Sequence, residues 1–369
     1  MKICFVNVGD IQSIATMKRS TGMAQPLIEL GHQVAIVALD SEVNKVRFQT
    51  ECPDMEVLLY KQVPGFTRLK EVRDKMKLIN AWKPDVVYVS SIGFRNFITK
   101  YNVNAKVVVV EHCELLSSIP QQRFRWIYRL LENSCNYLYD GMIVASRFLE
   151  NYYKGKGFSI PLLYSPWGYN PATLQKVDPL ILAQLKEKYA NRKIILYMGR
   201  LHINYGFMEI IDVAESLVRE FPDLLFLILG NGKDRSIGEQ KVKEKNIEKY
   251  VSFLGYVAEE QELPNYLALA DVFVSPLNDT IQDKARCPGK LFMYSCFRKP
   301  VVTCAIGEAN ELFGDKGFYY EHNNISSFSN AIKKALQSST ISLVDPLLHT
   351  WSVRANQLTG WLNSNFDLV

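Results

Sequence analysis

The stretch Ile194–Gly206, which reads IILYMGRLHINYG, decides the fold of this chain. Its first five residues form an apolar run, which is typical of a strand buried on both faces of a parallel sheet. A loop that starts with Gly199 and Arg200 follows, and then a helical pattern over Gly206–Glu220. A strand, a glycine-bearing loop and a helix in this order predict one unit of a doubly wound α/β domain.

Similar apolar runs and helical patterns recur on both sides of this stretch. Before it, the predicted strands are Ile3–Val8, Val34–Ala38, Val86–Val89, Val107–Val110 and Met142–Ala145, with helices at Arg68–Ala81 and Phe124–Leu138. After it, the strands are Leu225–Leu229, Val251–Leu254, Val272–Ser275, Pro300–Thr303 and Phe318–Tyr320, with helices at Glu259–Ala268, Pro288–Phe297 and Ser326–Leu336. The alternation predicts α/β architecture throughout.

The chain is long enough for two such domains, since 369 residues exceed one ordinary domain. A stretch rich in Pro, Gly, Asn and Ser, Tyr164–Thr173, is the best candidate boundary. We therefore expect an N-terminal domain over 1–170, a C-terminal domain over 171–345, and a last helix over 346–369 that packs back on the N-terminal domain. Ligands of open α/β sheets bind beyond the carboxyl ends of the strands, so we expect a site where the two sets of strand ends face each other.

Composition narrows the class of protein. Hydrophobic residues make up 48% and charged residues 22%, which argues against disorder. No apolar run is long enough for a membrane-spanning helix, and the N-terminus turns polar too soon for a secretory signal. Seven scattered cysteines without a C-x-x-C pair disfavour both a disulfide framework and a structural zinc site. The sequence therefore predicts a cytoplasmic protein.

The strand-following loops carry the candidate chemistry. Arg200 follows Gly199 in a loop that leads to a helix N-terminus, a setting suited to phosphate oxygens, although a tight turn with a surface arginine is the alternative. Neither G-x-G-x-x-G nor G-x-x-x-x-G-K-[ST] is present, which disfavours NAD and ATP. Gly230-Asn231-Gly232 and Gly255-Tyr256 follow two other strands and could approach a nucleotide; plain turns and a core tyrosine are the alternatives.

The segment Ala285–Leu291, ARCPGKL, is the most informative of these loops. Pro288 suits the first turn of a helix, and Arg286 and Lys290 flank that turn. Two cations beside free backbone amides favour a polyanionic ligand such as a diphosphate, and a solvated loop is the alternative.

At this point the chain resembles the family 4 glycosyltransferases, which retain anomeric configuration and have the GT-B fold of two Rossmann-like domains. The motifs that carry the resemblance, in order along the chain, are Gly31–Val34, Lys83–Val87, Glu111-His112, Ile143–Ser146, Gly199–Leu201, Leu229–Gly232, Phe253–Gly255, Ala270–Pro276 and Lys299–Val302. The resemblance implies metal-independent transfer of a sugar from a nucleotide diphosphate donor, expected to be a UDP-sugar, with the donor in the C-terminal domain and the acceptor in the N-terminal one. No cofactor beyond this co-substrate is implied, and the metal site is expected to be absent.

The resemblance also assigns residues. His112 and Arg200 take the catalytic positions, and Arg200, Arg286, Gly289, Lys290 and Leu291 the diphosphate positions. Gly230, Gly232, Gly255, Tyr256 and Met293 fall in the nucleotide pocket, and Gly9, Asp10, Tyr205, Asn278 and Asp279 in loops near the donor sugar or the cleft. For His112, a buried structural histidine is the alternative, and its acidic neighbours Glu111 and Glu114 could fix the tautomer of the ring.

Two departures from the family pattern leave other functions open. The lysine of the family pattern falls on Tyr205, and the two glutamates of the pattern fall on Ala285 and Met293. The second glutamate normally holds the ribose hydroxyls, and methionine cannot. A nucleotide-sugar 2-epimerase of the same architecture and a catalytically inactive sugar-nucleotide-binding scaffold are the rival functions. The epimerase would need positioned acid and base groups, for which only His112 is a good candidate.

The positive charge lies in the first half of the chain. Residues 1–170 hold 21 Lys and Arg against 15 Asp and Glu, whereas residues 171–369 hold 22 against 23. Trp126 and Tyr128 lie among Arg123, Arg125 and Arg129, a mixture that can dock on an anionic bilayer. A basic helix with its aromatic side in the core is the alternative, and no nucleic-acid motif accompanies the charge. The acceptor is therefore expected to be a saccharide or a lipid-linked saccharide in surface polysaccharide or glycoconjugate synthesis, and a peripheral place at the inner face of the membrane stays open.

Overall fold

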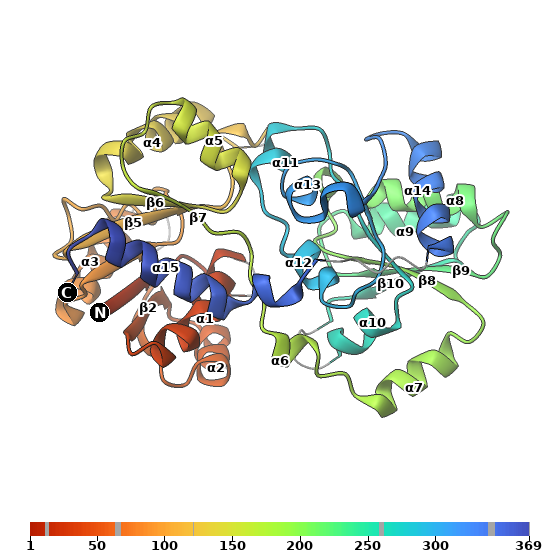
Figure 1. Cartoon of the computed structure of the whole chain (residues 1–369), viewed down its shortest axis with the longest axis horizontal. Coiled ribbons are helices and arrows are strands. Elements are labelled where there is room, and N and C mark those ends of the chain that lie inside the picture. Colours follow the sequence, from red (N-terminus) through yellow and green to blue (C-terminus); the bar gives the residue numbers. More distant parts are fainter. Residues whose placement is uncertain (12–14, 63–67, 121, 258–261, 339–343, 369) are drawn as a thin grey trace. The chain divides into compact units, whose positions relative to one another are not determined.

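The computed structural model describes all residues except 12–14, 63–67, 121, 258–261, 339–343 and 369. The described chain divides into two compact α/β units. The first holds Met1–Gly168, Ala285–Cys287 and His349–Val369, and the second holds Tyr169–Lys284 and Pro288–Leu348. Each unit contains one sheet whose paired strands all run parallel (Figure 1). The predicted doubly wound α/β class is confirmed.

The sheet of the first unit has the order β3-β2-β1-β4-β5-β6-β7 within the described residues. Its strands are β1 (Lys2–Val6), β2 (Gln33–Leu39), β3 (Glu56–Tyr60), β4 (Val86–Val89), β5 (Val107–His112), β6 (Gly141–Val144) and β7 (Leu162–Tyr164). Sequence patterns predicted the five inner strands and missed β3 and β7. Both missed strands lie at the edges of the sheet, where one side is unpaired and less apolar sequence is needed.

Helices cover both faces of this sheet. They are α1 (Ala15–Glu29), α2 (Glu42–Glu51), α3 (Arg68–Trp82), α4 (Arg125–Leu138), α5 (Arg147–Gly155) and α15 (Trp351–Asn365). One core cluster contains residues of α1 and α15, and the cluster on the other face contains residues of α3, α4 and α5. Predicted helix bounds are right to within two residues for α3 and α4.

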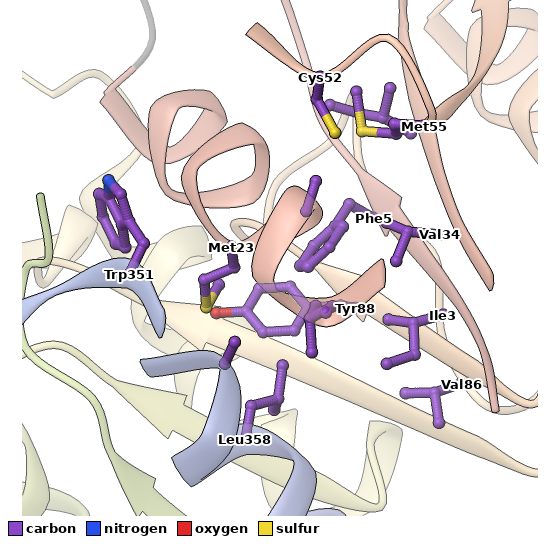
Figure 2. Packing of buried hydrophobic residues seen from close by; sticks show 14 of the residues in the cluster. Ile3, Phe5, Met23, Val34, Cys52, Met55, Val86, Tyr88, Trp351 and Leu358 are labelled. Carbon is purple, nitrogen blue, oxygen red and sulfur yellow. The ribbon is translucent and has the colours of Figure 1, made fainter. Parts of the chain in front are cut away.

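The last helix, α15, lies beside α1 in the first unit (Figure 1). Figure 2 shows Trp351 and Leu358 of α15 and Met23 of α1 around Phe5 and Tyr88 of the sheet. A Cβ built on Gly22 would come within 2.4 Å of the Trp351 indole. The Trp351 ring therefore occupies the space that a side chain at position 22 would take. This contact sets how closely α15 packs on α1.

The sheet of the second unit has the order β10-β9-β8-β11-β12-β13 within the described residues. Its strands are β8 (Lys193–Met198), β9 (Leu224–Leu229), β10 (Val251–Gly255), β11 (Val272–Ser275), β12 (Val301–Thr303) and β13 (Phe318–Tyr319). The helices are α6 (Pro171–Leu174), α7 (Pro179–Lys188), α8 (Phe207–Leu217), α9 (Arg235–Glu244), α10 (Leu263–Leu269), α11 (Ile281–Ala285), α12 (Gly289–Ser295), α13 (Glu308–Phe313) and α14 (Ile325–Gln337). Every strand of this sheet was predicted to within one residue at each end.

Some predicted positions need correction. Pro288 is not in the first turn of a helix but is the residue that caps α12, which has only seven residues. Gly206 precedes α8 with a φ of 73°, so that helix begins at Phe207. Residues 285–287 group with the first unit, because Ala285 lies in its core and its carbonyl accepts a hydrogen bond of 2.7 Å from Ser146 Oγ. Amino-acid composition does not reveal a tertiary contact of this kind. The predicted domain boundary at residue 170 therefore could not assign residues 285–287 to the first unit.

The described residues contain no helix long and apolar enough to cross a membrane.

Candidate functional site

The strand order of the second unit reverses between β8 and β11, and ligands of open α/β sheets bind at such a point. The loop after β8 holds Gly199 and Arg200, and the loop after β11 holds Asn278 and Asp279. The two loops touch, because Asn278 Nδ2 donates a 2.9 Å hydrogen bond to the carbonyl of Asn204. The structure thus brings together two loops that the sequence singled out, through residues 74 positions apart in the chain.

Three strand-end loops interlock at this edge of the sheet. The amide of Gly230 donates a 2.6 Å hydrogen bond to the carbonyl of Gly255, and the amide of Leu201 donates one of 3.0 Å to the carbonyl of Asn231. A Cβ on Gly230 would lie 1.9 Å from the Gly199 carbonyl oxygen, and one on Gly232 would lie 2.0 Å from that of Leu201. Glycine is required at both positions because backbone lies against backbone there.

Lys290, in the first turn of α12, reaches the same edge. Its Nζ lies 4.2 Å from the centroid of the Tyr197 ring and would lie 3.5 Å from a Cβ on Gly199. The ammonium group therefore stands beside the loop that carries the exposed Arg200. Two cations, one from the loop after β8 and one from α12, give this edge the charge that a phosphate group requires.

The remaining predicted residues of the second unit differ in exposure. Tyr256 is 57% exposed next to Gly255, as a residue that stacks on a base would be. The side chains of Leu291 and Met293 are buried, so a ligand could meet Leu291 only through its backbone. Tyr205 lies edge-on to the ring of His202, and Asp279 pairs with Lys284 at 2.6 Å, which lowers the pKa of the Asp279 carboxyl.

The sequence did not reveal other contacts that hold the Asn278 loop and its neighbours in place. Asp283 is buried, and its Oδ2 accepts hydrogen bonds from the amide of Asn278 at 2.6 Å and from Asn278 Nδ2 at 3.2 Å. Arg235 of α9 donates to Asn231 Oδ1 at 2.8 Å and to the carbonyl of Phe253 at 3.2 Å, which ties two of the interlocked loops together. Neither residue lies in a recognisable motif, so only the folded chain identifies them.

The remaining candidates lie in the first unit. Gly9 follows β1 with a φ of 71°, and the carboxylate of neighbouring Asp10 accepts a short hydrogen bond from Ser41 Oγ. This loop follows β1 at the reversal of strand order in the first sheet, between β1 and β4. Arg286 groups with the same unit, where it lies near Glu114. The structure therefore places Arg286 in a different unit from Arg200 and Lys290.

His112 is the last residue of β5. Its side chain is buried, with 3% exposed. Nδ1 lies 2.7 Å from the hydroxyl of Tyr153, and Nε2 lies 3.5 Å from Sγ of Cys135. Tyr153 and Cys135, and not the acidic neighbours, thus lie against the two ring nitrogens, and Glu111 pairs with Arg19. Burial lowers the pKa of His112 to about 4, so the ring is neutral at pH 7.

Acidification is expected to destabilise the first unit through His112. In the unfolded chain the imidazole takes up a proton as the pH falls through about 6.5, while the folded ring resists protonation until about pH 4. The free energy of unfolding therefore has its full value above about pH 6.5, and it decreases by up to about 3 kcal/mol as the pH falls to about 4. Denaturant unfolding of the parent and of His112→Gln at several pH values measures the difference. Identical pH dependence of the two proteins would exclude this role.

Among the described residues, no group of three or more His, Cys, Asp or Glu side chains is arranged to hold a metal ion.

Part of the second unit is similar to a known family of proteins. Residues 192–338 match the family model of glycosyl transferases group 1. The chain is 21% identical over 168 residues to 2-deoxystreptamine N-acetyl-D-glucosaminyltransferase of Niallia circulans. That match covers 45% of this chain and only 42% of the relative's own length.

Two solved structures share the fold over almost their whole length. Alr3699/HepE of Anabaena, solved in complex with UDP and glucose, has a TM-score of 0.74 at 17% identity and covers 100% of this chain, which covers 96% of that one. Sucrose-phosphate synthase of Thermosynechococcus elongatus has a TM-score of 0.75 at 16% identity. The match covers 99% of this chain and 98% of that one. The predicted GT-B class, two parallel Rossmann-like sheets, is confirmed.

Proposed function

We propose that this chain, a distant member of the group 1 glycosyltransferases through residues 192–338, transfers a sugar from a nucleotide diphosphate donor to a saccharide or lipid-linked acceptor. One observation carries the proposal. Lys290 and the Arg200 loop meet at the β8–β11 reversal of the second sheet, beside three loops that require glycine for backbone packing. A diphosphate needs both features, cationic side chains and close approach of the backbone.

The parts of the donor are assigned to the second unit as follows. Arg200 and Lys290 bind the diphosphate, and the Gly230–Gly232 turn lies against the nucleoside. The exposed ring of Tyr256 stacks on the base. UDP is the proposed nucleotide, with support from the UDP complex of Alr3699/HepE, which has the same fold. Met293 cannot accept hydrogen bonds from the ribose hydroxyls as a glutamate would, so those hydroxyls must bind elsewhere.

Transfer would proceed with retention of configuration and without a metal ion, as in the family that the sequence resembles. The role that a metal would have, offsetting the charge of the leaving diphosphate, falls to Arg200 and Lys290. The acceptor is assigned to the first unit, whose loop after β1 carries Gly9 and Asp10 at the corresponding reversal of strand order.

The rival functions have less support. An epimerase would need an acid and a base beside the sugar, and His112, the sequence candidate, is buried with both ring nitrogens next to Tyr153 and Cys135. A binding scaffold without activity is favoured by the replacement of the family glutamates by Ala285 and Met293, and turnover separates it from a transferase.

The direct test is a panel of UDP-, GDP- and ADP-sugars with the purified chain in a chelator. A donor at about 100 times its Kd adds about 2.7 kcal/mol of stability, so the true donor should raise the melting temperature. Slow release of free sugar and nucleoside diphosphate should then continue without divalent ions. A new epimer would indicate the isomerase, binding without turnover the scaffold, and activity that only magnesium or manganese restores would contradict metal independence.

A further inference from the structure

The solvent side of α4 is apolar at positions where a surface helix is ordinarily polar. Trp126 is 65% exposed, Leu130 56% and Tyr137 69%. Spacings of four and seven residues put the three side chains on one side of the helix. Cys135 and Leu131, on the opposite side of α4, belong to the core of the first unit. The alternative in which the aromatic side of this helix is buried is therefore wrong for Trp126. We call Trp126, Leu130 and Tyr137 the outer face of α4.

A neighbouring segment that packs beside α4 also carries exposed aromatic rings. The ring of Phe94 lies 5.9 Å from that of Tyr128 in the first half of α4, and the amide of Lys100 donates a 3.1 Å hydrogen bond to the carbonyl of Leu138 at its end. The segment 94–101 thus runs along the helix. It adds two exposed aromatic rings, Phe94 at 40% and Tyr101 at 72% exposure. The first unit therefore exposes aromatic rings both on the outer face of α4 and on the segment beside this helix.

The exposed charges in the first half of α4 and just before it are all positive. Arg123, Arg125 and Arg129 are exposed. The acidic residue of α4, Glu132, is 1% exposed, and its oxygens accept hydrogen bonds from the amide and the hydroxyl of Ser117 at 3.0 and 2.5 Å. The fold therefore removes the one carboxylate of this helix from solvent and leaves the arginines outside.

We propose that the outer face of α4 docks this protein on an anionic lipid bilayer. Tryptophan and tyrosine favour the headgroup region, leucine enters the acyl boundary, and arginine binds lipid phosphates. Charge complementarity selects this occupant, because lipid phosphates supply the counter-charge for three arginines that an apolar protein face would leave without one. At 14 residues α4 is too short to span a bilayer and lies in its plane. The proposal rests on the first unit alone and needs no assumption about the donor site.

The test is co-sedimentation of the full chain with vesicles of phosphatidylcholine, alone or with about one third phosphatidylglycerol. We expect binding to the anionic vesicles only. Binding should weaken in 1 M sodium chloride, which shortens the Debye length from about 10 Å at 0.1 M to about 3 Å. Arg123→Gln with Arg129→Gln should lower the partition coefficient roughly 30-fold, at about 1 kcal/mol per arginine. Trp126→Ser with Leu130→Ser should lower it by about tenfold or more.

Matched controls come from α7 of the second unit, where Leu180 is 75% exposed and Lys186 and Lys188 are exposed. Leu180→Ser and the pair Lys186→Gln with Lys188→Gln should bind anionic vesicles as the parent does. All changed side chains are exposed, and circular dichroism and melting temperature verify each fold.

Three results would overturn the proposal: recovery of the parent in the supernatant with anionic vesicles, parent-like binding of both α4 variants, or losses in the α7 controls as large as those in α4. A dimer in vesicle-free solution that Trp126→Ser with Leu130→Ser dissociates would assign the face to a second copy of the chain instead. Donor turnover without vesicles tests the proposed function separately, so the two failures are distinguishable.

Discussion

Replacing Lys290 by alanine is expected to weaken the binding of a nucleoside diphosphate by between about 10-fold and 150-fold. The reason is the loss of one charge-assisted hydrogen bond, worth about 1.5–3 kcal/mol. The Lys290 ammonium, 4.2 Å from the Tyr197 ring centroid, stands beside Gly199 at the end of β8, where a phosphate group would meet it. Arg200→Ala should have an effect of similar size. Isothermal titration with UDP measures both.

The matched control for this experiment is Lys243→Ala. Lys243 is exposed on α9 of the same unit, so its replacement removes a positive charge from the unit without touching the strand-end loops. It should leave UDP affinity unchanged, while Lys290→Arg should retain part of the binding because the charge remains. Parent-like affinity in both Lys290→Ala and Arg200→Ala would remove these residues from the donor site and take away the main support for the proposed function.

The second large effect is expected for Gly230→Ala, at about 3–5 kcal/mol of destabilisation. Gly230 has a φ of 128°, which side chains rarely adopt, and its new Cβ would lie 1.9 Å from the Gly199 carbonyl oxygen. A shift of Gly230 would break the hydrogen bond from its amide to the Gly255 carbonyl, and a shift of Gly199 would strain the one from its amide to the Leu229 carbonyl. A strongly lowered melting temperature of the second unit and loss of UDP binding should therefore occur together.

Gly360→Ala serves as the reference for this substitution. Gly360 lies inside α15, and nothing stands within 4 Å of its Cβ position. Alanine should stabilise that helix by up to about 1 kcal/mol, because it loses less backbone entropy on folding. If Gly230→Ala melted within about 2 °C of the parent, the close packing of the Gly199 and Gly230 loops would not exist in solution.

The candidate site follows from the sequence only in part. Arg200, Gly230, Gly232 and Lys290 were found because each directly follows a buried strand or begins a helix, and that position is visible in the linear pattern. Asp283 and Arg235, which hold the neighbouring loops, were not found. They act through contacts with residues 5 and 18 positions away, and no local pattern marks a residue of that kind.

His112 is the opposite case. Its sequence motif identified it as a candidate, but the surroundings of its ring could be known only from the fold. The pair Glu111-His112 indicates a polar strand end. In the fold, however, Tyr153 of α5 and Cys135 of α4 surround the ring, and Arg19 of α1 takes the neighbouring carboxylate. Three helices from different parts of the chain thus decide the state of one side chain. Burial, which depends on all of them together, determines the pKa of His112.

The sequence by itself determined the fold class, the inner strands of the first sheet and all the strands described in the second. Strands buried on both faces must be apolar throughout, and that requirement is written directly into runs such as Val107–Val110 and Leu225–Leu229. Only the tertiary structure decided the edge strands β3 and β7, the placement of Ala285–Cys287 in the first unit, and the exposure of Trp126 beside a buried Glu132. Each of these depends on which distant segment covers a residue, and the free energy of burial depends on that covering and not on the residue's neighbours in the chain.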